Sequence, residues 1–115
     1  AQDWADKLRD RGCAFEHRPN NRAGENLTFF APPGSQRPED VAHGWYSEVS
    51  LYDFAKGDFD FNTGHFTQVV WRSTQSLGCG VSTCNGGELW VCNYDPPGNM
   101  MRSFRQNVQP SSCSN

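Results

Sequence analysis

The sequence predicts one small α+β domain that is stabilised by disulfide bonds. Two stretches have helical periodicity and two others form a hairpin pattern, so helices and an antiparallel sheet are both expected. The length of 115 residues suits a single domain. Apolar residues are scarce, because the chain has no Ile and its Leu, Val and Phe total only 20. Five cysteines therefore suggest covalent stabilisation in an oxidising compartment.

The charge and hydropathy of the chain exclude two classes of partner. The formal net charge is -3, so there is no sequence-wide positive field for nucleic acid. No stretch approaches the roughly 20 apolar residues that span a bilayer, and the first ten residues lack the pattern of a signal peptide. We expect a soluble, processed chain with no membrane span and no nucleic-acid partner.

Two stretches have the apolar periodicity of an amphipathic helix. In residues 1–12, apolar side chains recur on one face, and Gly12 supplies a stop. Pro38 suits the first position of a second helix over residues 38–52, in which acidic side chains at the start favour the dipole. The two apolar faces consist of Ala1, Trp4, Ala5 and Leu8, and of Val41, Ala42, Trp45, Val49 and Tyr52.

Between this second helix and the hairpin lie two less regular segments. Residues 53–64 scatter Gly, Asn and Asp among three Phe, which predicts an irregular loop that is unusually rich in aromatic side chains. Residues 65–74, HFTQVVWRST, fit either a strand or a short helix, and periodicity alone does not choose between them.

The clearest local signal is a β-hairpin. Residues 85–86, Asn-Gly, form a two-residue turn between the stretches 77–84 and 87–95. With this turn Cys79 lies directly opposite Cys92, in the closer kind of cross-strand pair with Cα atoms about 4.5 Å apart. A disulfide can bridge such a pair.

The other three cysteines are Cys13, Cys84 and Cys113. Cys84 lies an odd number of residues from Cys79, so it points to the opposite face of the sheet and needs another partner. Cys13, just after the first helix, is the partner that we prefer. Cys113 would then remain unpaired in a tail rich in Pro and Ser, as a free thiol, as half of an intermolecular bridge, or without any role.

Several titratable residues could carry chemistry if the fold brings them together. His17, His65, Glu25 and Glu48 could form a divalent-metal site with open positions, or an acid and base pair. Sequence spacing by itself favours a scattered surface set, because such residues are common and mostly exposed. His43 occupies a polar position of the second helix, and we assign it to the surface.

Five segments resemble the CAP superfamily, which comprises cysteine-rich secretory proteins, antigen 5 and pathogenesis-related class 1 proteins. Two of them resemble its long signature motifs, and three shorter ones follow the family order. These segments are GHFTQVVWRST (64–74), LWVCNYDPPGN (89–99), AGENL (23–27), WYSE (45–48) and LGCG (77–80).

The resemblance implies an α-β-α sandwich, with a small antiparallel sheet between helical layers and HFTQVVW as a short helix. It implies that His17, Glu25, Glu48 and His65 converge in a surface cleft, where the two His can hold Zn or another divalent ion together with waters. It also implies the pairs Cys79 with Cys92 and Cys13 with Cys84.

One departure from the family concerns the start of the chain. Members usually carry a further helix that covers one side of the sandwich, before the segment resembling AQDWADKL. Either the chain is a processed or truncated form, or another copy buries the apolar face left uncovered here, because large exposed patches seldom persist in monomers. We expect a homodimer, formed by association or by swapping.

The aromatic loop has a family interpretation as well. Fungal members that bind sterols use an aromatic loop before the first signature motif, with rings at positions i, i+2 and i+7, and Tyr52, Phe54 and Phe59 have that spacing. We expect these rings and Phe61 to gate an apolar cavity for a sterol or a fatty acid. In the alternative interpretation, Phe59 and Phe61 fold back onto the core and anchor the loop as a lid, without binding a lipid.

The preferred function is therefore a secreted, extracellular, lipid-binding CAP domain of the fungal or plant pathogenesis-related kind, acting in defence or virulence. One alternative is a metal-dependent hydrolase or peptidase with Glu25 or Glu48 as base, although most zinc hydrolases use three protein ligands. Another is a protein-interaction module without a small-molecule ligand. The domain is expected over residues 1–105, with a flexible tail over 106–115.

Overall fold

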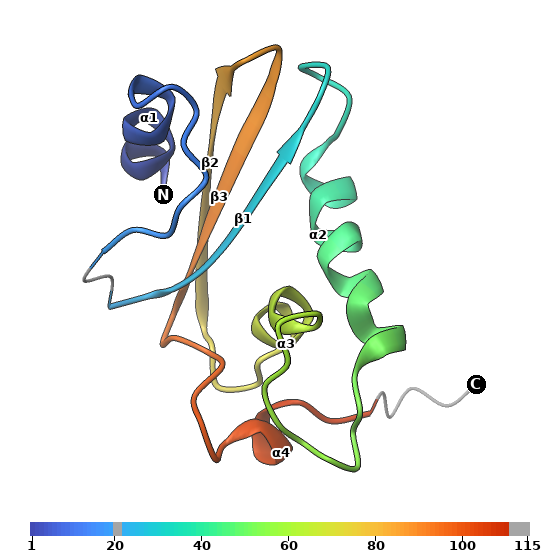
Figure 1. The fold of residues 1–115 in the computed structure, drawn as a ribbon. Coiled ribbons are helices and arrows are strands. Elements are labelled where there is room, and N and C mark those ends of the chain that lie inside the picture. Colours follow the sequence, from blue (N-terminus) through green and yellow to red (C-terminus); the bar gives the residue numbers. More distant parts are fainter. Residues whose placement is uncertain (20–21, 111–115) are drawn as a thin grey trace.

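The protein is a three-layer α-β-α sandwich in the computed structural model, which describes residues 1–19 and 22–110 (Figure 1). The central layer is an antiparallel sheet of three strands in the order β1-β3-β2. Within the described ranges, no helix is long and apolar enough to cross a membrane. The elements are α1 (Gln2–Asp10), β1 (Gly24–Phe30), α2 (Pro38–Tyr46), the 3-10 helix η1 (Ser47–Leu51), α3 (Gly64–Val69), β2 (Ser76–Cys84), β3 (Gly87–Asp95) and α4 (Phe104–Asn107).

Helix α1 covers one face of the sheet, which confirms the first predicted helix. Trp4, Ala5 and Leu8 are buried on its inner side, and they pack against sheet residues that alternate along the strands, as period-2 geometry requires. Gly80 lets α1 approach β2 closely, because a Cβ at this position would lie 2.4 Å from the Cα of Gln2. The sheet residues of this cluster are Leu27, Leu89 and Val91.

Helix α2 covers the opposite face and confirms the second predicted helix, with a different final turn. Its α-helical part ends at Tyr46, and the chain continues as the 3-10 helix η1 to Leu51. The start is stabilised by Asp40, whose carboxylate accepts a hydrogen bond of 2.9 Å from the backbone N–H of Arg37. Val41 and Trp45 of α2 pack against the β3 side chains Trp90, Cys92 and Tyr94.

A third, mainly aromatic cluster holds the irregular part of the chain. The ambiguous segment forms the short helix α3, as the family resemblance implies, and its Phe66 is buried here. Helix α4 adds Phe104, and Val108 just beyond it is also buried, with 3% of its surface exposed. Burial of apolar surface thus keeps the chain against the domain as far as Val108, two residues beyond the expected start of the tail at residue 106.

The hairpin has the predicted register and both expected disulfides. Cys79 lies opposite Cys92, and the two are bonded with their Cα atoms 4.1 Å apart. Cys84 is bonded to Cys13 with a Cα distance of 5.7 Å, which ties the end of β2 to the loop after α1. Cys113 lies outside the described residues.

The two disulfides should differ in how much they stabilise the domain. The first closes a sequence separation of 71 residues and the second one of 13. In the chain-entropy model, loss of the Cys13–Cys84 bond costs about 4 kcal/mol and loss of Cys79–Cys92 about 3 kcal/mol. Urea unfolding of the C13A/C84A and C79A/C92A variants measures both values. A larger loss in C79A/C92A would contradict the entropic explanation.

Candidate functional site

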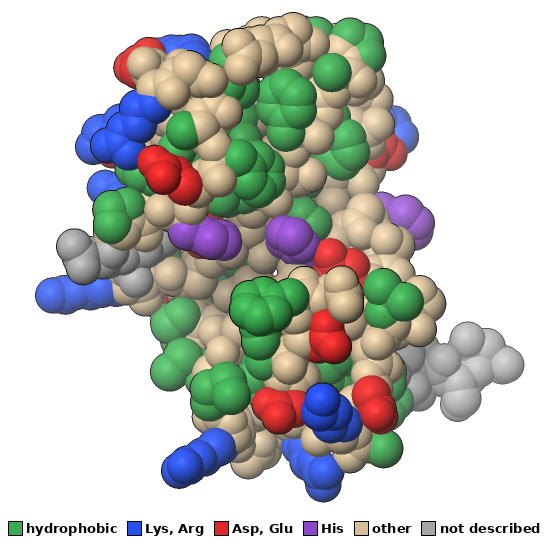
Figure 2. Space-filling view, viewed as in Figure 1, with side chains coloured by type: hydrophobic (Ala, Val, Ile, Leu, Met, Phe, Trp, Pro, Cys, Tyr) green, Lys and Arg blue, Asp and Glu red, His purple; other side chains and the backbone are tan. Residues whose placement is uncertain are grey.

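His17 and His65 lie together in one surface cleft, although 48 positions separate them in the sequence. The cleft has a volume of about 300 Å³. Figure 2 shows two of the imidazoles next to each other along a hollow across this face of the molecule. The described residues that line the cleft are Phe15, His17, Glu25, Asn26, Leu27, Phe59, Phe61, Gly64, His65 and Asn99.

The first imidazole is held by a buried carboxylate of strand β1. His17 lies in the loop after α1, and its Nδ1 is 2.9 Å from Oε1 of Glu25. The same oxygen accepts a hydrogen bond of 2.9 Å from the backbone N–H of Arg18. Asn93, the cross-strand neighbour of Glu25, donates to its other oxygen over 3.2 Å. These bonds satisfy a carboxylate whose side chain is only 5% exposed.

The second imidazole repeats this arrangement with residues from the other helical layer. His65 is the second residue of α3, and its Nδ1 is 2.9 Å from Oε2 of Glu48 in η1. The backbone N–H of Phe66 donates to Oε1 of the same carboxylate over 2.9 Å. Trp45 stacks on the imidazole, with ring centroids 5.9 Å apart and an interplanar angle of 9°. The His65 ring is therefore fixed in both position and orientation.

Both imidazoles are arranged as metal ligands commonly are. A carboxylate on Nδ1 favours the proton on that nitrogen, which leaves the lone pair on Nε2. Among residues 1–19 and 22–110, neither Nε2 atom has a hydrogen-bond partner, and both rings are accessible, with 68% and 37% of their side chains exposed. The donor set therefore fits a divalent cation bound through the two Nε2 atoms.

The protein itself would supply few ligands to such a cation. In the described part of the chain, no group of three or more His, Cys, Asp and Glu side chains is arranged to hold a metal. Glu25 and Glu48, the candidates for a catalytic base, each accept a backbone N–H and contact an imidazole Nδ1. The geometry thus places them behind the imidazoles, as groups that position the rings.

Asparagines that the sequence analysis did not select complete the site. Asn26 is 2% exposed, and its Nδ2 donates to the carbonyl of His65 over 3.3 Å and to the hydroxyl of Tyr94 over 3.2 Å. Burial raises the pKa of Tyr94 to about 12, so this hydroxyl stays protonated even in moderately alkaline solution. Asn99 donates to the carbonyl of Gly64 over 3.0 Å. Asn26, Asn93 and Asn99 lie inside the quoted motifs, but only the paired strands and packed helices show what they contact.

The four predicted loop aromatics occupy different environments. Tyr52 is buried, and Phe54 packs against it with ring centroids 4.8 Å apart. Phe59 and Phe61 both line the cleft, and their ring centroids are 5.1 Å apart. Phe59 also contacts Phe104 of the third cluster at 6.3 Å, whereas Phe61 is 90% exposed. The lid-anchor alternative therefore describes Phe59, and Phe61 is the ring that projects at the cleft.

Known proteins share the sequence pattern of this chain. A family model described as "CAP: Cysteine-rich secretory protein family" matches residues 1–94. The chain belongs to the CAP family. This agrees with the α-β-α fold that the family resemblance implied.

Two relatives illustrate how far this CAP domain resembles other members. Protein PRY2 of Saccharomyces cerevisiae is 39% identical over 90 residues, which span 76% of this chain and 26% of PRY2. Golgi-associated plant pathogenesis-related protein 1 of Homo sapiens is 37% identical over 116 residues, which span 96% of this chain and 73% of that protein. The chain covers between 26% and 42% of the length of PRY2 and of two further curated relatives, GLIPR1-like protein 1 and cysteine-rich secretory protein 1 of Mus musculus.

A solved structure supports the same fold. The crystal structure of NaASP2 with Zn²⁺ matches this CAP domain with a TM-score of 0.64 and 29% sequence identity, over 87% of this chain and 58% of that one. The sandwich is thus shared with a protein whose structure was determined together with zinc.

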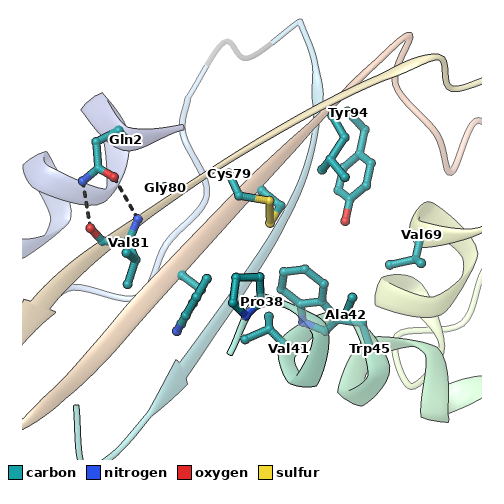
Figure 3. A pocket seen from close by; sticks show the side chains of 13 residues that line it. Gln2, Pro38, Val41, Ala42, Trp45, Val69, Cys79, Gly80, Val81 and Tyr94 are labelled. Atoms are coloured by element: carbon teal, nitrogen blue, oxygen red, sulfur yellow. Dashed lines mark hydrogen bonds between the residues drawn. A yellow bond between two sulfur atoms is a disulfide. The ribbon is translucent and has the colours of Figure 1, made fainter. Parts of the chain in front are cut away.

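This CAP domain has a second hollow, an apolar groove between α2 and the sheet (Figure 3). Its volume is about 370 Å³, and its walls include Trp45 of α2, Trp90 and Tyr94 of β3, and the Cys79–Cys92 disulfide. The four loop aromatics do not line this groove. Tyr52, Phe54 and Phe59 lie in the third cluster, where ring contacts bury part of their surface, and Phe61 lies at the cleft with 90% of its surface exposed.

Proposed function

We propose that this CAP domain is an extracellular binding protein whose cleft holds a divalent cation and an apolar ligand, a sterol or a fatty acid. The observation that carries the proposal is the pairing in the cleft: two imidazoles, each with a carboxylate on Nδ1, lie in the same hollow as the exposed ring of Phe61. The imidazoles that would bind the cation therefore lie next to the phenyl ring that would contact the apolar ligand.

The cation proposal rests on the histidine environment. His17 and His65 would hold the cation through their Nε2 atoms, and water or ligand atoms would complete its coordination. Glu25 and Glu48 would raise the basicity of the imidazoles and keep the rings oriented. The likeness to NaASP2, solved with Zn²⁺, makes zinc the first probe to use.

The apolar-ligand proposal rests on exposed aromatic surface. A phenylalanine with 90% of its surface exposed is unfavourable in water, and covering such a ring contributes about 1.5–3 kcal/mol. Phe15, another ring of the cleft, is 59% exposed. A ligand with a flat or flexible apolar body would cover both rings.

Two observations support the proposed extracellular location, the disulfide bonds and the family. Two disulfides are typical of proteins from oxidising compartments. The family itself is described as secretory. Both observations favour a protein that passes through the secretory pathway.

The cation site can be tested by histidine substitution. We expect H17A and H65A to abolish Zn²⁺ binding measured by titration calorimetry, because each removes half of the protein ligands. The E48Q variant should weaken binding by about tenfold, because the carboxylate on Nδ1 is lost. H43A is the matched control, since His43 is exposed on α2 outside the cleft. Equal loss of binding in H43A would contradict the assignment.

The apolar site can be tested at Phe61, where removal of the ring does not open the core. We expect F61A to weaken binding of a fluorescent sterol or fatty acid by about tenfold, because the ligand loses one ring contact. L51A is the matched control, since Leu51 is 65% exposed and lies outside the cleft. Unchanged affinity in F61A for both ligand classes would remove the loop from the binding site.

We also propose that a second copy of the chain covers the apolar groove. Leu77 at the groove is 64% exposed, and an apolar hollow of this kind favours association. We expect sedimentation equilibrium to show a dimer that L77E weakens by about tenfold or more, because the charge would be desolvated. L51E is the control of equal exposure outside the groove. A monomer mass at every concentration would refute the proposal.

A further inference from the structure

The tip of the β2–β3 hairpin presents an exposed Asn-Gly pair. Asn85 and Gly86 form the two-residue turn between the strands, and both residues are exposed. Their φ angles of 49° and 74° are left-handed, as the favoured hairpin turn with this pair requires. Beyond its chain neighbours, a Cβ on Gly86 would have no heavy atom within 4 Å, so nothing covers the turn on the glycine side. The sequence contains no other Asn-Gly pair.

An asparagine that precedes a glycine can react with the peptide nitrogen that follows it. The Gly86 nitrogen attacks Cγ of Asn85, so an N–Cγ bond forms and the Cγ–Nδ2 bond breaks. The amide proton of Gly86 leaves with Nδ2 as ammonia, and a cyclic imide remains. Water then opens the imide at one of its two carbonyls. Opening at Cγ gives aspartate, and opening at the backbone carbonyl gives isoaspartate, whose main chain runs through Cβ and Cγ.

The other asparagines in the described part of the chain lack this combination of features. Glycine favours the reaction because it has no Cβ beside the attacking nitrogen. Asn62 is also exposed, but it precedes Thr63, which is β-branched and only 1% exposed. Asn26 and Asn107 are 2% and 9% exposed, so packing restrains their side chains. Asn85 therefore combines exposure with an unhindered nucleophile, and Asn62 is the matched comparison.

The Asn85 side chain ties the hairpin tip to the loop that follows α1. Its Nδ2 donates a hydrogen bond of 3.2 Å to the carbonyl of Gly12. The adjoining residues of the two segments, Cys13 and Cys84, form a disulfide. Deamidation replaces the donor with a carboxylate, which has no proton to donate at neutral pH and would face the Gly12 carbonyl. Isoaspartate also lengthens the main chain of a two-residue turn that fixes the hairpin register.

The loop held by this hydrogen bond leads to the candidate site. Cys13, Phe15 and Asn85 line a hollow of about 280 Å³ beside the hairpin tip. Phe15 also lines the cleft, and His17 follows it by two residues. A change at the hairpin tip therefore acts on the segment that carries one imidazole of the cleft.

We infer that Asn85 is a site of spontaneous deamidation in the folded protein, and that its conversion releases residues 12–17 from the hairpin tip. The turn supplies both reacting groups, the side-chain amide of Asn85 and the peptide nitrogen of Gly86, and water is the only co-reactant. Neither a cation nor an apolar ligand takes part in this reaction, so it is independent of the proposed function.

The reaction is tested by incubating the full chain in mildly alkaline buffer and mapping its peptides by mass spectrometry. We expect aspartate and isoaspartate to form at Asn85 about tenfold or more faster than at Asn62, because only glycine leaves the nucleophile unhindered. The G86A variant should lower the rate to that of Asn62, since its methyl group has room but shields the nitrogen, and circular dichroism checks its fold. Equal rates at Asn85 and Asn62 in the parent chain overturn the inference, whether or not G86A folds.

The structural consequence is tested with N85D, which carries the aspartate product from the start. We expect its Tm to fall by about 3 °C or more, because the hydrogen bond to Gly12 is lost. Trypsin should cleave the Arg11–Gly12 bond about threefold or more faster than in the parent chain, because the loop opens more often. Q106E is the matched control, since it adds the same charge at an exposed position of α4. An unchanged Tm and cleavage rate in N85D, or equal changes in Q106E, overturn the release of the loop and leave the reaction site standing.

Discussion

The central strand β3 is the constraint on which the rest of this domain depends. Its side chains alternate between two cores, with Leu89 and Val91 under α1 and with Trp90, Cys92 and Tyr94 under α2. A strand buried on both faces must pair on both edges to satisfy its backbone, and β1 and β2 do so. Because the chain is poor in apolar residues, the two disulfides supplement the packing by restricting the unfolded chain.

The edge strand β1 explains how two distant imidazoles meet. Consecutive side chains of a strand point to opposite faces, so Glu25 and Asn26 serve different layers. Glu25 reaches His17 in the loop that follows α1, and Asn26 reaches the backbone of His65 in α3. The cleft therefore straddles the edge of the sheet, and its two halves come from the two helical layers of the sandwich.

The hydrogen bonds of this cleft tie both carboxylates to the imidazoles. A buried carboxylate needs hydrogen-bond donors, and Glu25 finds them in Arg18 N–H and Asn93. Glu48 finds one in Phe66 N–H. Each carboxylate is thus committed to holding an imidazole in place. The exposed rings of Phe15 and Phe61 give the same cleft an apolar rim.

The sequence by itself determined the features that depend on neighbours in the chain or on family motifs. The hairpin register, and with it the Cys79–Cys92 bond, follows from a two-residue turn because strand geometry propagates residue by residue. The two long amphipathic helices follow from local periodicity, and the grouping of His17, Glu25, Glu48 and His65 follows from the motif resemblance. Only the tertiary structure decided that both carboxylates stand behind the imidazoles, and that Tyr52 is buried while Phe61 projects into water. Burial in an irregular loop has no sequence period, because it depends on which distant rings and backbone groups pack against each residue.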